Sequence, residues 1–139
     1  MFENKTITFK EAEDYHKGLM ILTNAVEASE KGVGLDLTYK LIQGLKKIEE
    51  QVESINKART KLYEIYGTLD DKGVLTPHKG KEDILEPLNK DMEEFLAKED
   101  EFSLIKDKIK VEDIKHLILK PSFLILWDKY LEGLEEYEW

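Results

Sequence analysis

Apolar residues recur in alternating steps of four and three along the stretch from Leu35 to Tyr66. This spacing is typical of a long helix with an apolar seam that packs against other helices. Lysine and glutamate fill the positions between, so we expect the opposite face to be solvated. Such a helix cannot cover its own seam, and we expect the rest of the fold, or another chain, to be arranged around it. The seam positions are Leu41, Leu45, Ile48, Val52, Ile55, Arg59, Leu62 and Tyr66.

A second helical pattern precedes this stretch, from about Lys10 to Ala28. A short segment with two glycines, residues 29–34, separates the two patterns. Two amphipathic helices joined by a short loop favour an antiparallel hairpin. The apolar positions of the first helix are Ala12, Tyr15, Leu19, Leu22 and Val26.

The segment from Gly67 to Gly80 breaks the helical pattern. Asp70 to Gly73 has the composition of a tight turn, and short β-prone pieces flank it on both sides. Either a β-hairpin or a mobile loop fits this segment. A short strand is also expected at Thr6–Phe9.

The pattern after residue 80 predicts shorter elements, both helices and a strand. A third helix is expected from about Ile84 to Glu101, with Pro87 in its first turn. A strand at Ser103–Val111 follows, which pairs either with the amino-terminal strand or with the hairpin. One helical turn is expected at Glu112–Leu117, before a last helix that begins near Lys120. The predicted buried face of the last helix is Phe123, Leu124, Trp127, Leu131 and Leu134.

Together these elements predict a mostly α (α+β) fold in a single domain over residues 1–139. Residues 10–66 form the long antiparallel helix hairpin, and residues 67–80 form a turn or small β element. Residues 81–139 supply a helix, a strand and the C-terminal helices.

Charge and composition narrow the classes of partner. The formal net charge is −9, so direct nucleic-acid binding is not expected, whereas a basic protein partner would be compatible. The absence of cysteine excludes disulfides and fits a reducing compartment. No apolar run is long enough for a membrane span, and the amino-terminal residues do not resemble a secretory signal. These features favour a cytoplasmic protein without a membrane partner.

No motif predicts catalytic, cofactor-binding or metal-binding residues. His16, His78 and His116 lie far apart in the sequence, and none has the spacing of a zinc site. Asp70 to Gly73 lacks the alternating ligands of a calcium loop. We therefore interpret the protein as a non-enzyme without a cofactor.

Arg59 is the only arginine and falls on the apolar seam. In one interpretation its stem packs while its guanidinium reaches water. In the other it pairs with a carboxylate and sets the register of two helices, as polar seam residues do in coiled coils. The sequence leaves both open, so Arg59 is a candidate interface residue.

Aromatic residues gather near the carboxyl end, and aromatic side chains are enriched where proteins bind proteins. The alternative is that Phe123 and Trp127 close the core over the helix hairpin. The candidate interface residues of this group are Phe123, Trp127, Tyr130, Tyr137 and Trp139.

Several short stretches follow one another between about Leu19 and Leu117. They are Arg59-Thr60-Lys61, Asp70 to Gly73, Glu93 to Glu101, Lys108 to Val111 and Asp113-Ile114. In this order of parts the chain resembles a family of small uncharacterised phage proteins from viruses of Gram-positive bacteria. The resemblance implies a phage accessory or structural protein and transfers no catalytic residue.

Two functions are favoured, and an enzyme is kept only as a residual third hypothesis. The first is a non-enzymatic interaction protein, phage-encoded, that acts through helix faces on a host or virion protein or on further copies of itself. Its location would be the host cytoplasm or the virion. The alternative is an acidic inhibitor of a host protein that mimics nucleic acid, which needs carboxylates arrayed in a stripe at phosphate-like spacing. Lysines mixed through every helix speak against the mimic.

Overall fold

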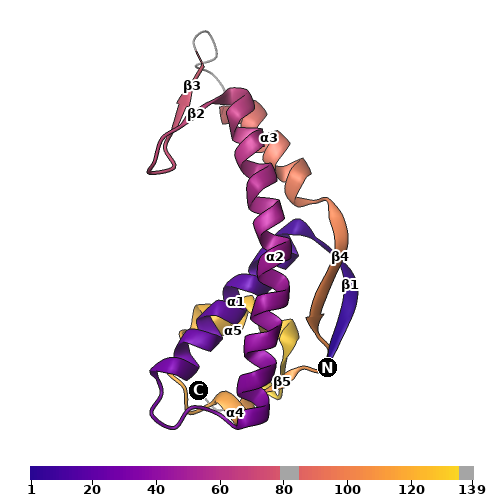
Figure 1. Cartoon of the computed structure of the whole chain (residues 1–139), viewed down its shortest axis with the longest axis vertical. Helices are drawn as coiled ribbons and strands as arrows, with labels where there is room; N and C mark the ends of the chain where they lie inside the picture. The colour runs from indigo at the N-terminus through magenta and orange to yellow at the C-terminus, as the bar shows by residue number, and fades with distance from the viewer. Residues whose placement is uncertain (79–84, 135–139) are drawn as a thin grey trace.

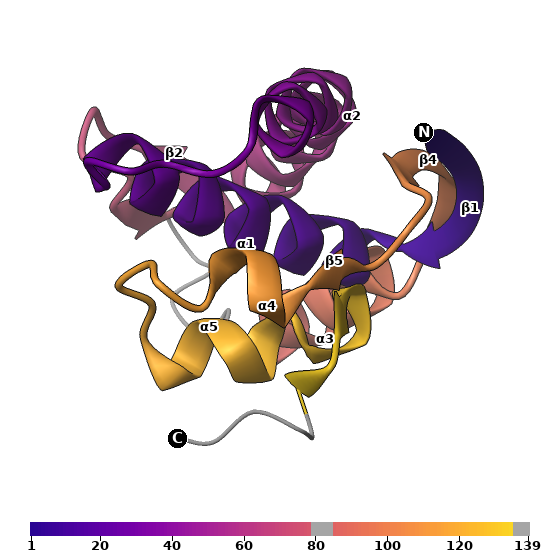
Figure 2. The same cartoon turned by 90° about the horizontal axis from the view of Figure 1, so that it is seen from below.

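The computed structural model describes residues 1–78 and 85–134. It is a mostly helical α+β structure, as the hydrophobic pattern predicted. The long helix α2 lies on one side, α1 crosses it, and the short C-terminal helices cover the other side of α1 (Figures 1 and 2). The helices are α1 (Phe9–Ala28), α2 (Leu35–Tyr66), α3 (Leu85–Leu96), α4 (Val111–Ile114) and α5 (Pro121–Leu126), with a 3₁₀ turn at Asp128–Tyr130.

Helix α1 is the most enclosed element. Its first turn is fixed by a capping box, in which the Thr8 hydroxyl accepts from the Glu11 amide and the Glu11 carboxylate accepts from the Thr8 amide. Because α2 packs on one side of it and α5 on the other, α1 and not α2 occupies the centre of the core, contrary to our expectation. The buried residues of α1 are Ala12, Tyr15, Gly18, Leu19 and Leu22.

The seam of α2 is covered by its own chain. The buried residues of α2 lie in its first two-thirds, where α1 and a β ribbon pack against it. Beyond Ile55 the seam is only half-buried, and α3 supplies the contacts there. The six-residue connection 29–34 joins α1 to α2 and the two helices pack against each other, which is roughly consistent with the predicted helix hairpin, but α1 crosses α2 at an angle instead of running along it (Figure 1). The buried residues of α2 are Leu41, Gly44, Ile48, Val52 and Ile55.

A curved two-stranded ribbon joins β1 (Phe2–Thr8) to β4 (Glu99–Ile105) in antiparallel register (Figure 1). Gln51 of α2 satisfies the free edge of β4: its amide donates to the Glu101 carbonyl (2.9 Å) and accepts from the Ser103 amide (3.0 Å). Residues 99–101 were predicted as the end of the third helix, which was wrong. The helix ends at Leu96 because the following residues pair with β1.

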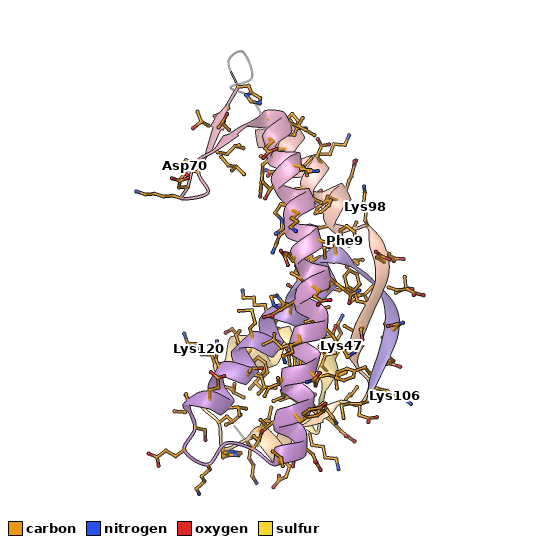
Figure 3. The ribbon with its side chains drawn as sticks, in the orientation of Figure 1. Phe9, Lys47, Asp70, Lys98, Lys106 and Lys120 are labelled. Carbon is orange, nitrogen blue, oxygen red and sulfur yellow. The ribbon has the colours of Figure 1, made fainter. Side chains whose placement is uncertain are left out.

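The segment after α2 is a β-hairpin, one of the two predicted alternatives. Strands β2 (Gly67–Leu69) and β3 (Leu75–Pro77) pair around a turn in which the Asp70 carboxylate accepts from the Lys72 and Val74 amides. The hairpin projects from the end of α2 (Figures 1 and 3).

The C-terminal region is less helical than predicted. The expected strand at 103–111 breaks after Ile105, and β5 (Ile109–Lys110) instead pairs in parallel with β6 (Leu131–Glu132). Helix α5 therefore ends at Leu126, and Leu131 reaches the core from a strand. Its burial was predicted correctly, but its secondary structure was not.

Candidate functional site

The C-terminal aromatic residues are core rather than free surface. Phe123 and Trp127 are each 1% exposed, so a protein partner cannot dock on them, and their prediction as interface residues was wrong. The alternative, that they close the core, is what the structure shows. Tyr130 is half-buried with its ring 5.0 Å from that of Tyr15, measured between centroids. Tyr137 and Trp139 lie outside the described residues.

Trp127 is held by three features of α1. Its indole stacks on the Tyr15 ring, with centroids 5.5 Å apart, and its Nε1 donates to the Tyr15 carbonyl at 3.0 Å. The third feature is Gly18, where a Cβ atom would lie 2.2 Å from Trp127 Cδ1. Only glycine leaves room for the indole at this crossing. The sequence placed Trp127 on a buried face but carried no signal that Gly18 receives it.

Arg59 is paired, as the second of its two interpretations proposed. Its Nη2 donates to the Glu13 carboxylate of α1, and its Nη1 donates to the Asn56 side chain at 2.9 Å. The two charged side chains are about one-quarter exposed. The pair therefore ties α2 to α1 from within the chain, which leaves Arg59 little capacity to bind a partner.

A cavity of about 330 Å³ opens between β1, the start of α1 and the loop after β4. Tyr15, Trp127 and Tyr130 line its inner side. Burial raises the pKa of the Tyr15 hydroxyl to about 12, so this group is a neutral phenol at physiological pH. Its oxygen accepts from the Ile105 amide at 3.1 Å.

The rim of this cavity is charged. It carries four lysines and three carboxylates, and Lys129 pairs with Glu11 at 2.9 Å. The hydrogen bond between them lowers the pKa of Glu11 and raises that of Lys129. Glu11 thus connects the helix cap to the rim. We call this site the lysine-rimmed cavity; its charged residues are Glu3, Lys5, Glu11, Lys106, Asp107, Lys108 and Lys129.

A second feature open to a partner is an apolar face on the first two turns of α2. Leu35, Tyr39 and Ile42 follow one another at i, i+4 and i+7 and are 84%, 56% and 41% exposed. By helical periodicity they lie opposite the buried seam. The spacing of these three residues is visible in the sequence, but the longer apolar seam on the other side of the helix dominates the pattern, so this face was not predicted. We call these three residues the apolar face of α2.

In residues 1–78 and 85–134, no three histidine, aspartate or glutamate side chains converge in a way that could hold a metal ion. None of the helices in that part of the chain has both the length and the apolar character of a bilayer span. No protein family, curated protein or solved structure matches the chain. A functional assignment therefore has to come from the surface itself.

Proposed function

We propose that the protein is a non-enzymatic interaction protein that binds another protein through the apolar face of α2. The observation that carries this proposal is the exposure of Leu35, Tyr39 and Ile42 on the side of the helix away from the core. Adjacent apolar side chains cost free energy while they face water, and such patches mark protein contact sites. An amphipathic helix docks against a groove or another helix through this spacing.

The resemblance to small phage proteins extends the proposal to a phage-encoded accessory or assembly factor. Its partner would then be a host protein in the cytoplasm or a virion component. The net charge of −9 disfavours a second copy of this chain and favours a partner with a basic surface around an apolar groove.

Substitution on the apolar face tests the proposal. Ile42→Asp places a charge on the face, and Ser54→Asp places the same charge at an exposed position further along α2. Both variants should fold, because neither residue belongs to the core. The wild type and Ser54→Asp should capture the same host or virion protein on a column, and Ile42→Asp should lose it by at least about tenfold.

Sedimentation velocity of the same proteins at two concentrations tests whether the chain self-associates. A wild-type protein that stays monomeric and captures nothing contradicts the proposal, as does an Ile42→Asp variant that binds like the wild type. The nucleic-acid mimic predicts a different result, namely release of the partner by duplex DNA. DNA that leaves capture unchanged argues against it.

A further inference from the structure

The lysine-rimmed cavity carries an inference independent of the apolar face. Its volume of about 330 Å³ lies within the range of small-molecule sites. It is built by segments remote in sequence: β1, α1, the loop after β4 and the residues after α5. Figure 3 shows Lys106, one of its rim residues, beside the end of the β1–β4 ribbon.

Charge at the cavity differs from charge over the whole chain. Lys129 and Glu11 neutralise each other through their ion pair. The remaining rim has three lysines against two carboxylates, in a protein whose net charge is −9. Lys5, Lys106 and Lys108 are all exposed, and no ion pair is shown for them within residues 1–78 and 85–134. The rim's excess of one positive charge favours an anionic ligand over a cationic one.

The inner wall supplies a polar donor and an apolar surface. The Tyr15 hydroxyl accepts from the Ile105 amide, and its own proton has no acceptor among the described residues. A buried hydroxyl gains free energy when its proton finds an acceptor. Apolar side chains, including Ile7, Leu104 and Ile109, line the same space. A ligand that fits both walls has an anionic end and an apolar body.

We propose that the lysine-rimmed cavity binds a small organic carboxylate. The carboxylate accepts from the Tyr15 hydroxyl and lies near the ammonium groups of Lys106 and Lys108. The apolar body packs against Ile109 and the half-buried ring of Tyr130. Binding at this site would also couple to the Lys129–Glu11 pair and so to the cap of α1.

Titration with sodium benzoate, followed by ¹⁵N–¹H correlation spectra, tests this site. Benzyl alcohol serves as the neutral analogue and inorganic phosphate as an anion without an apolar body. Benzoate should give saturable shifts of the Ile105 and Lys106 amides and of the Trp127 indole N–H below about 10 mM. Benzyl alcohol and phosphate should each bind at least about fivefold more weakly.

Single substitutions test whether benzoate binds in this cavity. Lys106→Ala and Lys108→Ala should each weaken benzoate binding by about threefold to fivefold. Lys46→Ala, at an exposed position on α2, should leave it unchanged. Tyr15→Phe keeps the ring and removes the hydroxyl, and it should weaken benzoate more than benzyl alcohol. The proposal is overturned if benzoate gives no saturable shift, if benzyl alcohol binds equally well, or if the rim variants bind like the wild type.

Discussion

The close packing of Trp127 against α1 depends on Gly18, which has no side chain. Gly18→Ala would place a Cβ atom 2.2 Å from Trp127 Cδ1 and 2.5 Å from Nε1, where ordinary contacts begin at 3.4 Å. The indole therefore has to move by about 1 Å within a packed core. Overpacking of this kind costs about 1–3 kcal/mol, and the Nε1 bond to the Tyr15 carbonyl, worth about 1 kcal/mol, is strained as well.

Alanine also stabilises a helix interior by about 1 kcal/mol relative to glycine. The net loss for Gly18→Ala is therefore about 2 kcal/mol in the free energy of unfolding. Gly44→Ala is the matched control, because it gains the same helix propensity. Its Cβ would lie 3.0 Å from Cδ1 and Cγ1 of Ile105, a milder overlap that a small shift of this side chain relieves. We expect Gly44→Ala to stay within about 0.5 kcal/mol of the wild type.

Urea unfolding followed by circular dichroism measures both variants. Gly18→Ala should lower the midpoint with an unchanged slope, and Gly44→Ala should leave the midpoint nearly unchanged. If Gly18→Ala is as stable as Gly44→Ala, the close approach of Trp127 to α1 is wrong.

Three further predictions concern other contacts in the structure. In a double-mutant cycle of Arg59→Leu and Glu13→Gln, urea unfolding should give a coupling of about 1 kcal/mol; additive effects would refute the pair. Glu11→Gln keeps the capping geometry but removes the charge that faces Lys129. The pKa of Glu11 is lowered and that of Lys129 is raised in the folded state. The pair therefore stabilises the folded protein between pH 4.5 and 10.5, the ordinary pKa values of the two groups. The variant should melt about 2 °C lower at pH 7, and the gap should close below pH 4.5; a gap independent of pH would contradict this. Gly67→Ala would place a Cβ atom 2.2 Å from the Thr76 carbonyl oxygen. It should abolish the cross-strand contacts of the β2–β3 hairpin in NMR spectra with little change in global stability, and an intact hairpin would refute the close approach.

Local patterns predicted the elements whose burial follows one helical period. The expected starts and ends of α1 and α2 agree with the structure to within a residue, because a single apolar face defines each helix. The turn at Asp70–Gly73 was also predictable from the sequence, because its hydrogen bonds join residues that are close neighbours in the chain.

Pairing between strands that are distant in sequence determines the secondary structure that local patterns did not predict. Residues 99–101 continue a helical pattern, yet they pair with β1, which lies about ninety residues earlier. Leu131 fits a helical face and a strand equally well until β5 is placed beside it. The lysine-rimmed cavity was not predictable for the same reason, because its walls come from four separate segments.

Site-specific photo-cross-linking can test the claim that a partner protein binds the apolar face of α2. Benzoylphenylalanine at position 39 lies on the face, and at position 57 it lies on an exposed polar part of the same helix. We predict one defined cross-linked protein from position 39, which disappears when Ile42→Asp is added, and none from position 57. Identical products from both positions, or no product from position 39, would contradict the claim.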